Sequence, residues 1–415
     1  MKNNKGITLV ALVVTIVVLL ILAGVSINLV LGNNGIIAKA QEAKTKQAEA
    51  SENDLKDMNS LIEQMENALS GSDNGGNTEP ETVPYLPSDD FHYDTSTSID
   101  TGLVIKDANG NEYVWVVVPK SLYNNVAYNS NNAKKPSSST DYANIEYCLQ
   151  QYTATYRDDT DYSDTYVADD KNVGWFADAT AYNNFKNSML KSVYENGGFY
   201  VGRYEAGIEI TGTNKTSRGP TNSDGKYTIE GIPTPVSKAD AYPYTYVTRT
   251  QAQNLASNVN SGTKTSSLMF GVQWDLVLAF MSKDTTKITD TSTLTSDSTT
   301  IGNYKDNLWT IKNAKAQYST NYGRTFTACP NPFKKEASSD ILLTTGADSS
   351  FSVQNIYDIA GNVWEWTLEK TSSNSNPCAV RGGRYDLNGS YYPAADRTFL
   401  TTDDTFTFGF RLSLW

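Results

Sequence analysis

The sequence predicts an α+β protein built from a long apolar N-terminal helix and a mixed outer domain with long loops. One apolar run near the N-terminus is long enough to cross a membrane, and a helix-forming stretch follows it. The rest of the chain alternates short β-branched and aromatic runs with polar stretches rich in Asn, Ser and Thr. Such a mixture is typical of a loop-rich α+β domain.

The composition excludes several functions. Asp and Glu outnumber Lys and Arg by 46 to 34, and no dense basic block follows the N-terminus, so nucleic acid is not an expected partner. A single histidine, His92, rules out a three-histidine metal centre. The three cysteines include no CxxC pair, which argues against a zinc ribbon. Cys329 and Cys378 could form an internal disulfide, or all three, with Cys148, could be small buried residues.

A membrane-spanning helix is predicted for residues 7–30, from Ile7 to Val30. No charged residue occurs between Lys5 and Lys39, and a spanning helix needs about 20 apolar residues. Basic residues precede the run, which favours a cytoplasmic N-terminus. We therefore expect this segment to contact membrane lipid and the remainder of the chain to be extracellular.

The predicted helix extends through residue 70, with a kink at the Gly and Asn residues of 32–35. Residues 39–69 contain neither Pro nor Gly and are rich in good helix formers. A narrow apolar stripe at alternating spacings of three and four residues suits a partner helix or the side of a domain. Residues 71–101 are polar and rich in Gly and Pro, which predicts a linker.

The N-terminal stretch "KGITLVALVVTIVVLLILAGV" resembles the start of type IV pilins and pseudopilins. The resemblance implies that residues 1–6 are a leader, which a prepilin peptidase cuts between Gly6 and Ile7. It also implies N-methylation of Ile7 and assembly with other pilin subunits into a pilus. The family usually has Glu at the fifth mature position, where this chain has Ala11, so filament assembly is in question. The alternative is a plain membrane anchor.

Several elements of the outer domain can be predicted from local patterns. Residues 112–119 form a β-branched, aromatic strand, and Asn109 and Gly110 before it suggest a hairpin turn. The other expected elements are a strand region at 197–210 and helices at 248–259 and 273–282. The polar stretches 121–171 and 282–350 are expected to be long loops or insertions on a mixed α+β core.

Three C-terminal motifs carry the strongest signal, namely "NIYDIAGNVWEWT" at 355–367, "VRGGRYDLNGS" at 380–390 and "FGFRLSLW" at 408–415. Trp364 and Trp366 are two residues apart, so on a strand they face the same side. In this order the motifs resemble the formylglycine-generating enzyme (sulfatase-modifying factor) family. The resemblance implies a C-type lectin-like domain over residues 102–415.

The same resemblance speaks against catalysis. The copper-dependent enzymes of the family use two cysteines, at places that here hold Leu387 and Tyr392. Neither side chain can replace a thiolate as ligand or nucleophile. The iron-dependent branch needs several histidines. We therefore expect a non-catalytic member, with an active enzyme of the same fold as a rival.

In this family the "GNVWEW" loop binds Ca²⁺, which prefers hard oxygen ligands. The resemblance places a structural calcium ion on the carboxylates of Asp358 and Glu365 and on the carbonyls of Gly361 and Val363. Alternatively, Asp358 caps a turn and Glu365 pairs with an arginine. The candidate arginines are Arg381 and Arg411.

Residues 384–408 are rich in Tyr, Asp, Asn and Thr, and the matching region of the fold faces ligands. The alternative is a solvated loop whose tyrosine rings cover the core. The candidate ligand-binding residues are Tyr385, Asp386, Asn388, Tyr391, Tyr392 and Arg397.

Together these patterns predict a pilin-like surface protein that binds an extracellular protein or glycan or acts in adhesion. Its frame also resembles the variable proteins of diversity-generating retroelements, whose C-terminal stretch is mutated at adenine-rich codons. A structural minor pilin or pseudopilin without its own ligand is the alternative.

Overall fold

The computed structural model describes residues 84–415, except 158–161, 168–175, 212–232, 260–264 and 402–406. The chain divides into two compact units, Met1–Gly76 and Asn77–Trp415. The described residues all belong to the second unit, the domain. The predicted leader, the Gly6–Ile7 processing site, the 7–70 helix and Ala11 lie outside the described residues.

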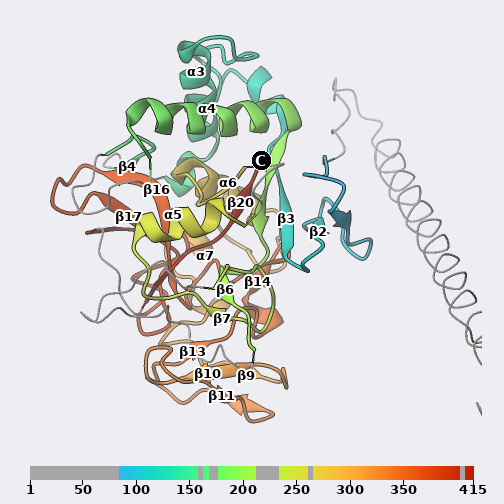
Figure 1. Ribbon diagram of the computed structural model, residues 1–415, viewed down its shortest axis with the longest axis vertical. Coiled ribbons are helices and arrows are strands. Elements are labelled where there is room, and N and C mark those ends of the chain that lie inside the picture. The colour runs from blue at the N-terminus through green and yellow to red at the C-terminus, as the bar shows by residue number, and fades with distance from the viewer. Residues whose placement is uncertain (1–83, 158–161, 168–175, 212–232, 260–264, 402–406) are drawn as a thin grey trace, which may run out of the picture. The chain divides into compact units, whose positions relative to one another are not determined.

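A six-stranded antiparallel sheet forms one wall of the domain, in the order β1-β2-β3-β5-β20-β8. The last strand, β20, lies between β5 and β8, so the C-terminal end of the chain is held inside the sheet (Figure 1). The strands are β1 (His92–Tyr93), β2 (Val104–Lys106), β3 (Glu112–Val117), β5 (Gly198–Gly202), β8 (Ser266–Ser267) and β20 (Ser413–Leu414).

The strand predicted at 112–119 is confirmed by β3. Its hairpin to β2 pairs Lys106 with Glu112 and contains Gly110 at a φ of +80°, as the Asn-Gly signal predicts. β1 pairs with β2 and lies in the stretch assigned to the linker. Tyr85, also from that stretch, packs its ring against Trp115. The described part of the linker, 84–101, is therefore packed on the sheet.

A second sheet of five strands carries the "VWEW" motif. Trp364 and Trp366 both contact the ring of Phe408, which confirms that they face the same side of β16. Glu365 faces away from them. The path is β18 (Arg397–Leu400), β17 (Cys378–Arg381), β16 (Trp364–Thr371) and β19 (Phe408–Gly409), and β4 (Tyr162–Ser163) also pairs with β16.

Five α-helices lie among the described residues: α3 (Ser139–Tyr152), α4 (Ala179–Asn196), α5 (Arg249–Ser257), α6 (Gly271–Met281) and α7 (Ser292–Thr295). α5 and α6 confirm the helices predicted at 248–259 and 273–282, and every residue of α6 is buried.

The expectation of a long loop at 121–171 is wrong, because it contains α3, and α4 was not predicted at all. Both helices are rich in polar residues, which hides their periodicity. Their caps were the usable signal: Ser138 and Asp178 accept backbone hydrogen bonds at the N-termini, and Gly197 ends α4 at a φ of +75°.

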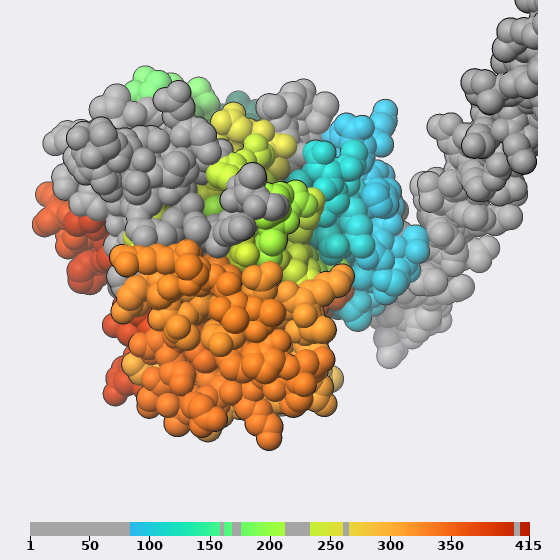
Figure 2. Space-filling view, turned by 60° about the horizontal axis from the view of Figure 1, so that its bottom comes forward, coloured from blue at the N-terminus to red at the C-terminus, as the bar shows by residue number. Residues whose placement is uncertain are grey.

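For 282–350 the long-loop expectation is wrong, and the alternative of an insertion is the arrangement present. Residues 309–351 form a small β-rich lobe with its own core around Trp309, Ile311 and Phe351, whereas α7 packs into the main core through Leu294. The lobe lies at the end of the domain opposite α3 and α4, and it forms one continuous orange surface (Figures 1 and 2). Its strands are β9 (Thr310–Ile311), β10 (Gln317–Ser319), β11 (Thr327–Ala328), β12 (Phe333–Lys334) and β13 (Leu342–Leu343).

Short strands complete the domain. β6 (Gly207–Ile208) pairs with β7 (Tyr242–Pro243), which confirms strand structure within 197–210 beyond β5. β14 (Ser352–Val353) pairs with β15 (Ile356–Tyr357) just before the "VWEW" strand.

The predicted Cys329–Cys378 disulfide is wrong. All three cysteines are buried and none forms a disulfide, which confirms the alternative of small buried residues. Cys329 belongs to the core of the β-rich lobe, whereas Cys378 belongs to the main core, so the two side chains lie in separate packing units.

The predicted fold class needs correction. Within the part of the chain that the structure describes, no helix is both long enough and apolar enough to cross a membrane. The expected transmembrane helix therefore has no support, and its segment is not among the described residues. What the structure shows is a mixed α/β domain with several separate sheets and few helices.

Candidate ligand-binding site

A pocket of about 480 Å³ opens beside the segment predicted to face ligands. Three parts of the chain enclose it: the 3₁₀ turn η2 (Ala154–Tyr156), the end of α7, and residues 390–397 before and at the start of β18. The lining residues are Thr155, Tyr156, Thr295, Ser296, Ser390, Tyr391, Pro393, Ala395, Asp396 and Arg397.

Hydroxyl groups dominate the pocket wall, and one aromatic ring stands at its surface. Tyr391 is 75% exposed, which is unusual for a large ring in a folded domain. Ser390 beside it is also exposed. Exposed tyrosine next to small hydroxyl residues is typical of protein recognition surfaces.

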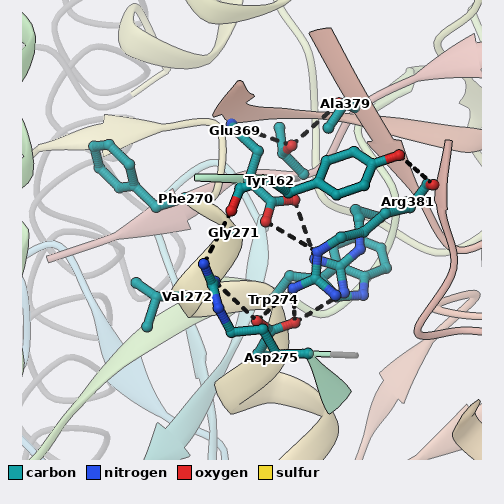
Figure 3. A network of polar contacts seen from close by, with 12 residues as sticks. Tyr162, Phe270, Gly271, Val272, Trp274, Asp275, Glu369, Ala379 and Arg381 are labelled. Carbon is teal, nitrogen blue, oxygen red and sulfur yellow. Dashed lines mark hydrogen bonds and ion pairs between the residues drawn. The ribbon is translucent and has the colours of Figure 1, made fainter. Parts of the chain in front are cut away.

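A set of buried charges lies beneath the pocket, and Arg157 contacts it from the edge, 3.7 Å from Asp275. Arg381 contacts Asp275 at 2.9 Å and Glu369 at 3.2 Å, and Arg397 contacts the same two carboxylates at 2.5 and 3.1 Å. No side chain of the four is more than 2% exposed. We call these four side chains the arginine–carboxylate ring; Figure 3 shows three of them, Asp275, Glu369 and Arg381, pointing toward one another.

The ring is balanced, with two acids and two arginines. Burial alone would raise the pKa of Glu369, but Arg397 and Arg381 outweigh it and hold that pKa below its ordinary value. The carboxylates likewise raise the pKa of Arg397, although burial opposes this. These shifts favour the charged forms of Glu369 and Arg397, and the ring ties α6 to β16, β17 and β18.

The N-terminus of α6 lies against the ring. Backbone N–H groups of Gly271 and Val272 donate to the Asp164 carboxylate at 2.7 and 3.0 Å, which suits the positive end of a helix. A Cβ on Gly271 would lie 1.9 Å from an oxygen of Glu369, so glycine is required for the helix to approach so closely. Burial, together with nearby Glu369 and Glu146, raises the pKa of Asp164 to about 7.

Hydrogen bonds from buried residues also hold the backbone of the pocket segment, residues 389–395. The indole of Trp274 donates to the Ala394 carbonyl at 2.9 Å, and Ala394 N–H donates to Ser298 at 2.8 Å. The Tyr304 hydroxyl lies 2.8 Å from the Tyr392 carbonyl. Gly389 N–H donates to Asp306. These bonds fix the backbone of 389–395 before any ligand arrives.

Of the six predicted ligand-binding residues, two line the pocket and four do not. Tyr391 and Arg397 line the pocket. Asp386 pairs with Arg384 at 2.7 Å, and the Asn388 carbonyl accepts from the backbone after it.

The remaining two predicted ligand contacts serve packing. Tyr385 is buried in a small cluster with Leu342 and Val363, and the ring of Tyr392 packs edge-on against Trp364. The rings of these two tyrosines pack against the core, as in the alternative of a loop whose tyrosines cover the core.

The predicted calcium residues lie in a second buried group of charges. Arg411 bonds both oxygens of Glu365, at 2.6 and 3.1 Å, and Asp358 accepts from Gly346 N–H at 2.7 Å. Glu205 accepts from the side-chain amide of Asn362 at 2.6 Å. We call Glu205, Asp358, Glu365 and Arg411 the carboxyl cluster.

Three acids share one arginine in the carboxyl cluster. Burial raises the pKa of Asp358 to about 6 and that of Glu365 to about 7, against the opposing effect of Arg411. Burial and the two neighbouring carboxyls raise the pKa of Glu205 well above its ordinary value. The cluster therefore holds protons near neutral pH.

This geometry fits calcium poorly, because Arg411 already supplies a positive charge to both oxygens of Glu365. Gly361 donates its N–H to the Gly382 carbonyl, and Val363 donates to Glu205. Within the described ranges, no three or more His, Cys, Asp or Glu side chains are grouped to hold a metal ion. The arginine alternative, with Arg411 as partner, is the arrangement present.

The buried acids that support the pocket could not be predicted from the sequence. Asp275 and Glu369 are separated by almost a hundred positions, and nothing in their local sequence indicates that they share two arginines. Thr155, Thr295 and Ser296 come from stretches predicted to be loops. The only local signals for this ion-pair network were the acid Asp275 beside Trp274 and the arginine Arg381 of the "VRGG" motif.

Comparison with known proteins adds little. No family model matches the chain, and no curated protein matches it. The pilin and sulfatase-modifying assignments, which rest on short motifs of common residues, thus have no support. Among solved structures, Treponema denticola variable protein 1 is a distant neighbour, with 14% identity, coverage of 52% of this chain and 95% of that chain, and a TM-score of 0.25.

Proposed function

We propose that the domain is a ligand-binding module whose recognition surface is the pocket at residues 390–397. One contrast carries the proposal. Beneath the pocket, buried ion pairs and hydrogen bonds fix the backbone, whereas at its surface Ser390 and Tyr391 are exposed. Neither of these two side chains makes a hydrogen bond or ion pair within the described part of the chain.

Rigid support of this kind favours binding. A segment that is already ordered loses little conformational entropy when it meets a ligand, so more of the contact energy appears as affinity. Tyrosine adds a large contact area with only two side-chain torsions to restrict. The distant neighbour is named a variable protein, which is compatible with a binder, although the proposal does not rest on it.

The proposal includes the absence of catalysis. Leu387 packs against the main core and Tyr392 against Trp364. The two places that the motif resemblance aligned with catalytic cysteines therefore serve packing here. Turnover of a cysteine-containing sulfatase peptide by the purified protein would contradict this part of the proposal.

A finer form of the proposal is that the recognition segment is diversified at the DNA level and displayed outside the cell. Ser390 and Tyr391 are exposed, and side chains of this kind can vary without disturbing the fold. A second, template-like copy of the DNA that encodes residues 384–408, close to the gene, would support it. Absence of such a copy would rule it out.

The proposal is tested by screening the full chain, immobilised, against glycans, extracellular proteins and peptides. We expect at least one class to bind, and Tyr391→Ala to weaken it about tenfold or more, as for a central aromatic contact. Phe399→Ala is the matched control, because Phe399 is 57% exposed on β18 but does not line the pocket. No binding, or equal binding by the Tyr391→Ala variant, would overturn the proposal.

A further inference from the structure

The chemistry of the pocket wall restricts the ligand further. Four residues with aliphatic hydroxyls line it, Thr155, Thr295, Ser296 and Ser390, and the two lining tyrosines are Tyr156 and Tyr391. The Thr295 hydroxyl already donates to the Thr291 carbonyl at 3.2 Å. Each hydroxyl can both donate and accept a hydrogen bond. Such a wall matches a ligand that carries several closely spaced hydroxyls of its own.

The two charged lining residues do not favour an anion. Arg397 is half-buried as a residue, but its side chain is only 2% exposed. Its guanidinium donates to Glu369, to Asp275 and to the Tyr156 carbonyl, so the pocket meets mainly its backbone. Asp396 contributes negative charge. A sulfate, phosphate or carboxylate group would therefore lose its hydration without gaining a cation.

The apolar part of the pocket wall lies where it could contact the face of a sugar ring. Tyr391 presents an exposed aromatic side chain, and Pro393 and Ala395 line the same pocket. An aromatic face can cover the C–H face of a sugar ring while the hydroxyls of the wall bind its edge. The volume of about 480 Å³ lies within the usual range for small-molecule sites.

The pocket is also built for binding rather than cleavage. Glycoside hydrolysis ordinarily uses a pair of carboxyl groups on either side of the scissile bond. Asp396 is the one carboxylate among the ten lining residues, and its Oδ2 accepts from Thr398 at 2.8 Å. A bound glycan would meet no second acid.

We propose that the pocket binds a neutral oligosaccharide through its hydroxyl wall, with Tyr391 against a sugar ring. This inference rests on the proposed binding function and names its ligand class. Recognition by neutral groups also predicts an affinity that changes little with ionic strength.

The test presents the full chain to matched neutral, sialylated and sulfated oligosaccharides at low and high salt. We expect binding to neutral members, about tenfold or greater loss with Tyr391→Ala, and less than about threefold loss with Tyr391→Phe, which keeps the ring. Phe399→Ala should bind as the wild type does. Unchanged melting temperatures of the variants would show that they fold.

The outcomes separate the two proposals. Preference for anionic glycans, or Tyr391-dependent binding of a peptide or protein alone, would overturn the oligosaccharide inference and leave the binding function standing. Neutral-glycan binding that Tyr391→Ala does not change would overturn the inference and place recognition elsewhere. No binding to any class would overturn both.

Discussion

The domain contains two buried groups of charges that use the same residue types in different proportions. The arginine–carboxylate ring has two acids and two arginines, and each arginine contacts both acids. The carboxyl cluster has three acids and one arginine. In the ring the pKa of Glu369 is lowered, whereas in the cluster the pKa of each acid is raised.

The difference shows how charge balance decides what a buried polar group does. A balanced set pairs each acid with a cation and holds three strands and a helix in fixed positions beneath the pocket. An unbalanced set takes up protons instead, because ionised carboxyls without a partner are costly in the interior. The first arrangement gives a rigid base for recognition, and the second makes stability depend on pH.

The largest expected effect comes from removing an arginine from the ring. Arg381→Met leaves Asp275 and Glu369 with less positive charge, and breaking a buried pair in this way costs about 3–5 kcal/mol of unfolding free energy. Urea denaturation at pH 5 and pH 8 measures it, and we expect a similar loss at both. A loss below about 1 kcal/mol would contradict the role of the ring.

Arg411→Met is the matched change in the carboxyl cluster. Its three acids can accept protons, so the loss should be clearly smaller at pH 5 than at pH 8. Equal losses at the two pH values would remove the distinction between the clusters.

A smaller effect is expected from neutralising one acid of the cluster. The folded-state pKa of Asp358 is about 6, above its unfolded value of 3.8, so the folded state holds a proton that the unfolded state releases. The stabilising contribution of this group is therefore present below pH 4 and is lost as pH rises through 6. The loss amounts to at most about 3 kcal/mol.

Asp358→Asn should remove that part of the pH dependence. Asn has an oxygen that can accept from Gly346 N–H, and it tolerates the φ of +57° at this position. Unfolding free energies between pH 4 and pH 7 should thus fall less steeply in the variant. An unchanged slope would show that Asp358 does not titrate in this range.

The sequence predicted local features of the fold better than the long-range ones. β3, its Asn-Gly hairpin, α5, α6 and the shared face of the two tryptophans all follow from residues near one another in the chain. The polar helices α3 and α4 were missed because side chains such as Tyr and Asn mask an amphipathic pattern. The β-rich lobe was missed because its strands are only two or three residues long.

The site could be predicted only in part. Tyr391 and Arg397, chosen because polar and aromatic residues gather between two motifs, line the pocket. The partners of Arg397 come from β16 and α6, and pairing across such distances leaves no trace in local sequence. Tyr385 shows the opposite error, since a residue type common on binding surfaces is buried here.

The most direct test of this account is the unfolding free energy of a variant with Ser390 and Tyr391 both changed to Ala. These exposed side chains serve recognition, whereas the buried ring stabilises the fold. Changing them should therefore lower the unfolding free energy only slightly. We predict a value within about 1 kcal/mol of the wild type, far from the loss expected for Arg381→Met. A loss above about 3 kcal/mol would show that the pocket surface is itself structural and would contradict the account.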